Sequence, residues 1–445
     1  MPLDAVPVTA GSGAAQKALG VATREYLGWV GDPLATLSAA VEAEPDFAFG
    51  HTLIGALRVL SGEPGRSEAV QAALKAAKRN EAKLNAWERA HVAAFEAWAN
   101  DQIRRAVAIW EEILIDHPRD IWALRFAHDT YFFLGDAGNL RDSMARVLPE
   151  WSEKDELYGY LLGMHAFGLE EVGDFRGAEV KGRRAVELNP KDTWAIHAVA
   201  HVLEMEGRTI EGIGWYKDLK EHWTPAVGLA VHQWWHLALY LIERGRLDEA
   251  LALYDNEIRA AKSGAILDLV DAAALLWRLK LAGVDVGTRW QELAPHWYGH
   301  LDDHVLVFND VHIALVAGIA GDRDTEAKLD GSITNYIDTG PRGTNRDVAA
   351  EVGRNLTRAI AAFSAQQFAQ AVDLLLPVRG QIRRIGGSNA QRDLFNQTLI
   401  AAAIGAGRLP LARALLAERV ALKPNSVTAR KLYDEVLVKL GRAAH

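Results

Sequence analysis

The chain has 445 residues, and its 49% hydrophobic and 24% charged content is typical of a protein that buries a large core. The formal net charge is −9, with Lys and Arg dispersed among Asp and Glu, so the average field disfavours nucleic acid and anionic membranes as partners. Cysteine is absent, which excludes disulfides, thiolate metal ligands and a cysteine nucleophile. We see no secretory signal and no run of the ~20 apolar residues that a membrane span needs, and we therefore expect a cytoplasmic protein.

The sequence begins with a segment rich in small residues, and residues 1–14 are expected to be flexible. Apolar residues then recur with helical period, so residues 15–445 are predicted to form a single α-helical repeat domain. Glycines mark the turns inside the predicted helical hairpins, because glycine readily adopts the left-handed conformation that closes a helix. Six such turns follow one another at intervals of 34 or 38 residues: Gly135, Gly173, Gly207, Gly245, Gly283 and Gly321.

Proline precedes four of the predicted helices, at Pro45, Pro118, Pro190 and Pro424. The segments 173–190 and 245–251 resemble tetratricopeptide hairpins, with small residues where the two helices cross. The predicted fold class is therefore all-α, a tetratricopeptide-like helical-hairpin solenoid curled around a concave cavity. Two stretches with Gly, Pro and aromatic residues, 286–304 and 330–350, are predicted to be irregular loops, and the first could close over the groove as a lid.

Histidines are spaced so that one wall of such a solenoid would carry several of them. His197 and His201 are four residues apart, as are His232 and His236, and the second pair follows the first by 35 residues. His312 comes 76 residues after His236, about two repeats later. All five precede glycine turns, which places them on the first helices of hairpins. Their distances from the turns put them on one helical face, so we expect them to line the concave surface together.

A metal site is one interpretation of this wall. Two histidines at i and i+4 can chelate one ion, and a neighbouring helix can complete the coordination shell. With no cysteine the ligands would be nitrogen and oxygen, which suits a divalent transition metal such as Zn or Fe. Gln233 stands where a zinc protease has its catalytic glutamate, so that protease pattern is absent. Weaker candidates for the same site are His128, His165, Asp271, His300 and His304. The competing interpretation is that each histidine is a hydrogen-bonded core residue.

Three segments carry a family resemblance. They are FNDVH at 308–312, GGSNAQRDLF at 386–395 and HQWWHLALYLIE at 232–243. Together they resemble the tetratricopeptide repeat protein 38 family, also called StaR-like, over nearly the whole chain. The resemblance implies an all-helical, tetratricopeptide-like fold and leaves the activity open.

Two functions from different classes follow from these features. The first is a small-molecule enzyme, a metal-dependent hydrolase or an oxidoreductase such as an oxygenase, in which His201, His236 and Asp310 are catalytic. Its aromatic or amide-type substrate would contact four tryptophans: Trp194, Trp234, Trp235 and Trp297. The alternative is a non-catalytic scaffold that binds a peptide or protein partner in its groove. The His, Trp and Asp content of the wall favours the enzyme and a small-molecule partner.

Overall fold

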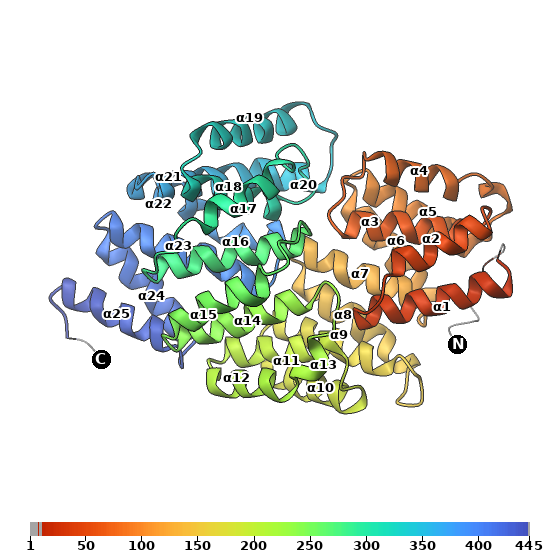
Figure 1. The fold of residues 1–445 in the computed structure, drawn as a ribbon, viewed down its shortest axis with the longest axis horizontal. Coiled ribbons are helices and arrows are strands. Elements are labelled where there is room, and N and C mark those ends of the chain that lie inside the picture. Colours follow the sequence, from red (N-terminus) through yellow and green to blue (C-terminus); the bar gives the residue numbers. More distant parts are fainter. Residues whose placement is uncertain (1–7, 9–10, 444–445) are drawn as a thin grey trace. The chain divides into compact units, whose positions relative to one another are not determined.

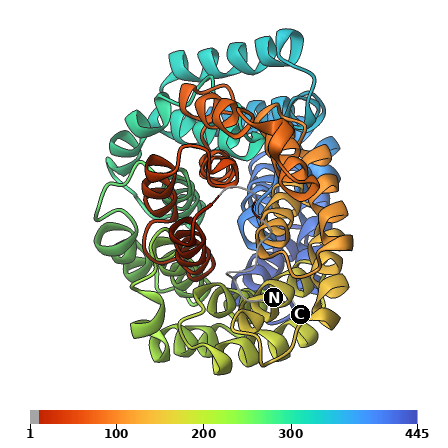
Figure 2. The same cartoon turned by 90° about the vertical axis from the view of Figure 1, so that its right-hand side faces the viewer.

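The protein is described by a computed structural model that covers Val8 and residues 11–443, and all regular structure among these residues is helical. Consecutive helices pack into hairpins that follow one another along the chain, as Figures 1 and 2 show. The all-α, tetratricopeptide-like solenoid predicted from the sequence is confirmed. No helix within the described part of the chain is both long enough and apolar enough to cross a membrane.

The chain divides into two compact units, whereas the sequence predicts one repeat domain over residues 15–445. Unit 1 takes the described residues up to Ala198, together with His222–Val227 and Gly340–Asp347. Unit 2 takes Val199–Glu221, Gly228–Thr339 and the described residues from Val348 onward. The division falls within helix α11 (Thr193–Met205), which therefore contributes its first turn and a half to unit 1 and the rest to unit 2.

Unit 1 consists of five helical pairs and the start of α11. The helices are α1 (Gly13–Gly28), α2 (Pro33–Ala43), α3 (Ala48–Leu60), α4 (Glu68–Ala77), α5 (Ala86–Ala99), α6 (Ile103–Asp116), α7 (Ile121–Leu134), α8 (Ala137–Val147), α9 (Tyr158–Glu171) and α10 (Phe175–Leu188). Helix α1 packs across α7, where Tyr26 stacks on Trp122 with ring centroids 5.3 Å apart. The predicted flexible segment 1–14 lies mostly outside the described residues. Within them, the Ser12 side chain accepts from the amides of Ala14 and Ala15 and so caps α1.

Unit 2 begins with the remainder of α11 and ends with the last helix of the chain. Its helices are α12 (Thr209–Asp218), α14 (Ala230–Glu243), α15 (Leu247–Leu253), α16 (Ile266–Leu281), α17 (Arg289–Tyr298), α18 (Val307–Ala320), α19 (Arg323–Thr339), α21 (Arg354–Ser364), α22 (Phe368–Leu375), α23 (Asn389–Gly405), α24 (Leu409–Leu422) and α25 (Val427–Lys439). Two short helices, α13 (Lys220–Trp223) and α20 (Thr344–Val348), lie where the chain passes between the units.

The predicted glycine turns are all present. Each of the six glycines has a positive φ, between 61° and 85°, and each follows the first helix of a hairpin. The sequence located these turns because the end of a helix is decided locally, by a residue that tolerates left-handed backbone.

The two predicted irregular loops are corrected by the structure. Residues 286–304 contain helix α17, and residues 330–350 contain the end of α19 and all of α20. In α17 the buried side chains of Trp290, Leu293 and Trp297 form one apolar face, so packing outweighs the helix-breaking tendency of Pro295.

The last helices of unit 2 contact its first helices, so this unit closes on itself. Helix α23 packs against α16, where the indole of Trp277 donates to the Thr398 hydroxyl at 2.9 Å. At the start of α25, the Asn425 amide donates to the carbonyl of Glu206 at 2.8 Å. The neighbouring Ser426 hydroxyl donates to Glu243 of α14 at 2.9 Å.

Candidate functional site

Three of the predicted wall histidines come together in unit 2. His201 lies on α11, and His232 and His236 lie one turn apart on α14. The ring centroids are 4.4 Å apart for His201 and His236, and 4.8 Å apart for His232 and His236. One ring nitrogen of each lies within 4.8 Å of the others. All three side chains are buried. We call His201, His232 and His236 the histidine triad.

Carboxylates from neighbouring helices orient two rings of the histidine triad. Nδ1 of His232 lies 2.9 Å from both carboxylate oxygens of Asp271, on α16. Nδ1 of His236 lies 3.1 Å from an oxygen of Glu204, on α11. A carboxylate at Nδ1 holds the proton there and leaves the lone pair of the neutral ring on Nε2. This is the orientation that metal-ligating histidines commonly receive from their supporting carboxylates.

Burial of the histidine triad shifts the pKa values of ionisable groups in and around it. Burial lowers the pKa of His236 well below its ordinary value, and the neighbouring His201 and His232 lower it further. Burial raises the pKa of Asp271, although the adjacent His232 acts in the opposite direction. Nζ of Lys423 lies 3.7 Å from Glu204 and adds a cation beside that carboxylate. Burial therefore disfavours the charged form of His236, and carboxylates lie beside the triad.

His197 lies one turn before His201 on α11 and belongs to unit 1. Its ring stacks on Phe167 with centroids 5.6 Å apart, and it contacts Trp194 at 5.1 Å. Trp194, predicted to bind substrate, is thus part of an aromatic group within unit 1 that also includes Trp29, at 6.0 Å.

The structure places His312 and Asp310 in other surroundings. Nδ1 of His312 donates to the carbonyl of Phe308, one turn earlier on α18, at 2.7 Å. Asp310 accepts from Nδ1 of His304 at 3.2 Å. Neither residue belongs to the group of described side chains whose ligand atoms approach the histidine triad within 4.8 Å. We therefore correct the expectation that they join the triad: His312 is bound to its own helix, and Asp310 to a loop histidine.

The remaining histidine candidates are each held locally. His304 also contacts the Ser332 hydroxyl at 2.9 Å through Nε2, and His300 lies 2.8 Å from Asp303 through Nδ1. In unit 1, burial lowers the pKa of His128 well below its ordinary value and that of His165 to about 4. His128 lies between the rings of Phe167 and Trp194, as expected of a core residue.

The other predicted tryptophans divide between core and surface positions. Trp235 is buried and stacks on His232 with centroids 5.2 Å apart, and the Arg278 guanidinium lies 5.2 Å from the Trp235 ring. Trp234, the preceding residue on α14, has the Lys220 ammonium 5.0 Å from its ring centroid instead. Trp297 is buried on α17 against His312, at 6.4 Å. Of the four, Trp235 is the one that stacks on a member of the triad.

Sequence reasoning missed three charged residues around the triad. They are Glu204, Arg278 and Lys423. Glu204 carried a signal, because it lies three residues after His201 and hence on the same side of α11. Arg278 and Lys423 carried none, since their proximity depends on how unit 2 closes.

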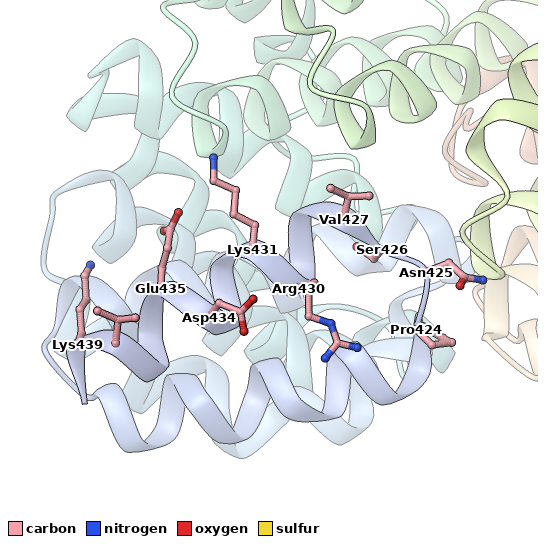
Figure 3. A pocket seen from close by; sticks show the side chains of 10 residues that line it. Pro424, Asn425, Ser426, Val427, Arg430, Lys431, Asp434, Glu435 and Lys439 are labelled. Carbon is pink, nitrogen blue, oxygen red and sulfur yellow. The ribbon is translucent and has the colours of Figure 1, made fainter. Parts of the chain in front are cut away.

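A groove lies elsewhere, along the last helix of the chain. It is widely open to solvent, has a volume of about 930 Å³, and is lined by side chains of α25 and the residues just before it (Figure 3). The lining includes Val427, Arg430, Lys431, Asp434, Glu435 and Val438. Val427 is 55% exposed and Val438 is 63% exposed, so both apolar side chains face solvent.

No family model matches the chain. Among solved structures it is similar to human IFIT1, seen as a dimer with PPP-AAAA, with 15% identity and a TM-score of 0.43, over 95% of this chain and 99% of that one. It is also similar to yeast Tom70, with 13% identity and a TM-score of 0.33, over 96% of both chains. A third is Naa15/Naa10 bound to HypK, with 12% identity and a TM-score of 0.25, over 96% of this chain and 66% of that one.

These findings correct the partner expectation. The IFIT1 structure contains PPP-AAAA, and the Naa15/Naa10 structure contains the protein HypK. The expectation of a small-molecule partner, with nucleic acid excluded, is therefore wrong. Composition misled here because net charge describes the whole surface and not the patch where a partner binds.

Proposed function

We propose that this chain is a non-catalytic tetratricopeptide-type scaffold that binds a protein partner, and that an amphipathic helix of the partner docks on the outward face of α25. The observation that carries the proposal is the exposed groove on the last helix of unit 2 (Figure 3). The sequence favoured a metal-dependent hydrolase or oxidoreductase. That hypothesis required a small-molecule substrate, and the partner expectation has been corrected above.

The exposed face of α25 is formed by side chains that recur at helical spacing. Val427, Lys431, Asp434 and Val438 follow one another in steps of four, three and four residues, so they share one side of the helix. The opposite side buries Ala429, Val436 and Leu437. The preceding helix, α24, packs against both α23 and α25, so both of its sides are covered by helices of the chain. A partner helix on α25 would continue the same packing by one further element.

The charges of this face favour a protein helix as occupant. Arg430, Lys431 and Lys439 alternate with Asp434 and Glu435 along α25. A mixture of both signs matches a helix that carries both signs beside an apolar stripe. A phosphate backbone instead requires a surface of consistently positive sign. The central side chains of α16 are less available, because Trp277 and Arg278 contact α23.

Membership in the tetratricopeptide repeat protein 38 family is part of this proposal. It is supported by the segments 232–243, 308–312 and 386–395 quoted above. Cytoplasmic location likewise stays a prediction.

Site-specific photo-crosslinking tests the docking surface. A photoreactive amino acid is placed at Val438, or as a control at Val180, which is 66% exposed on α10 of unit 1. Each variant is irradiated in extract of the source cells, and the adducts are mapped by mass spectrometry. We expect a protein adduct from position 438, absent from position 180, whose attached peptide has an amphipathic helical pattern. An RNA adduct, or equal labelling from both positions, would overturn the proposal.

A further inference from the structure

The histidine triad has a composition that packing alone does not require. Three imidazoles from two helices, α11 and α14, meet in the interior of unit 2, where His201 and His236 are 0% exposed and His232 is 4% exposed. Aliphatic side chains fill such a space at lower cost, because a buried polar ring must be compensated. The Asp271 carboxylate is buried with the rings, and the Glu204 carboxylate, on a side chain that is 12% exposed, contacts His236.

We infer that His201, His232 and His236 bind one divalent transition-metal ion, for which Zn²⁺ is the best match. Three neutral histidine nitrogens are an established ligand set for zinc, with water or a further group in the fourth position. One ring nitrogen of each histidine already lies within 4.8 Å of the others, a spacing that small side-chain movements close around a common ion. His197 belongs to unit 1, and the site does not require it.

Two carboxylates orient the imidazole rings of the site. Asp271 at 2.9 Å and Glu204 at 3.1 Å both contact Nδ1, which fixes the orientation of the His232 and His236 rings in the way that supporting carboxylates orient metal-ligating histidines. The negative charge of these carboxylates also offsets the charge of a divalent cation in a dry interior. His312 differs from His232 and His236, because its Nδ1 contacts the backbone carbonyl of Phe308 where theirs contact carboxylates.

The ion would have a structural role. It would join α11 to α14 at the start of unit 2, and it would also fix α16 through the contact of Asp271 with His232. Binding to the folded chain alone stabilises it, by mass action. The inference stands independently of the docking surface, because α25 contributes no ligand.

Metal content and thermal stability of the untagged full-length chain test the site. We expect about one zinc ion per chain, lost in His236→Gln and in His201→Gln. The matched control is His312→Gln, which also removes a buried histidine and should keep the ion. Adding Zn²⁺ to the chelated wild-type protein, at about 100-fold over Kd, should raise Tm by roughly 3 °C.

Cobalt substitution provides a readout that needs no variant. Co²⁺ added to the chelated wild-type protein should saturate at about one equivalent and give the visible absorption of a tetrahedral or five-coordinate site. A chelated wild-type protein that binds neither Zn²⁺ nor Co²⁺ saturably, or equal metal loss in His312→Gln, would overturn the inference. Failure of the photo-crosslinking experiment would not affect the metal-site inference, because α25 contributes no ligand.

Discussion

Asp192 illustrates how burial sets the behaviour of single residues in this chain. It precedes α11, and one of its carboxylate oxygens accepts from the amide of Ala195 at 3.0 Å. Burial is the largest influence on this carboxyl and raises its pKa from 3.8 to about 7, although the Ala195 amide and Arg125 act in the opposite direction. Between these pH values the folded chain holds a proton that the unfolded chain has released. The free energy of unfolding therefore falls as pH rises from about 4 to about 7, and is level above that.

We expect Asp192→Asn to remove this pH dependence. Asparagine keeps a side-chain oxygen for the Ala195 amide and carries no charge, so the variant should be more stable than wild type at pH 8, by up to about 4 kcal/mol. At pH 4 the two should be similar. Denaturant unfolding at both pH values measures the difference. Asp174→Asn, at the exposed start of α10, is the control. Equal pH profiles for wild type and Asp192→Asn would contradict the assignment.

The sequence predicted which histidines form the triad better than it predicted which side chains hydrogen-bond to them. The i,i+4 spacing of His232 and His236 fixes their common face on α14, and a repeat period brings His201 beside them. The contacts of Asp271 and Glu204 depend on the relative rotation of neighbouring helices, which no local pattern encodes. His312 shares the expected helical face, yet its Nδ1 is bound to the carbonyl of Phe308, four residues earlier.

Replacing two glycines of unit 2 with alanine should have opposite effects on the stability of the helices that contain or precede them. Gly245 has a φ of 70° at a hairpin turn, whereas Gly214 lies inside α12 with helical backbone. A Cβ at either position would meet no atom within 4 Å, so conformation alone decides. We expect Gly245→Ala to destabilise unit 2 by about 1 kcal/mol. Gly214→Ala should stabilise it by a similar amount, about 1 kcal/mol. Unfolding midpoints in urea measure both, and equal signs would contradict the turn assignment.

The packing of α23 against α16 is testable through one hydroxyl. Thr398→Val has nearly the same shape but removes the acceptor of the buried Trp277 indole N–H. Leaving that donor unpaired should cost about 1–3 kcal/mol. Thr398→Ser retains the hydroxyl and should keep the hydrogen bond. The free energy of unfolding, with tryptophan fluorescence as the probe, distinguishes them. If the valine variant is no less stable than the serine variant, α23 does not pack on α16 in this way.

Helix boundaries show where sequence patterns were sufficient at this scale. Turn glycines terminate their helices by local conformation, so these positions were predicted. Helix α17 was missed because Pro295 and Gly299 indicate a break, whereas burial of Trp290 and Trp297 stabilises the helix from outside the segment. The error lies where tertiary packing opposes local preference.

For the whole molecule, the main consequence of the fold is where a partner can bind. In unit 2 the final helices contact the first ones, through Asn425 with Glu206 and Ser426 with Glu243. This closure engages central side chains such as Trp277 and leaves the outward face of α25 exposed. The sequence predicted a solenoid but not its closure, because closure results from small rotations summed over several hairpins.

The central claim is that α25 docks a helix of a protein partner, and calorimetric titration of the crosslinked partner segment tests it most directly. The Val427→Asp/Val438→Asp variant should keep the wild-type unfolding midpoint, because both side chains are exposed, and should bind the segment at least about tenfold more weakly. Val180→Asp, on α10 of unit 1, should bind it with the wild-type Kd. An unchanged Kd in the α25 variant would contradict the account.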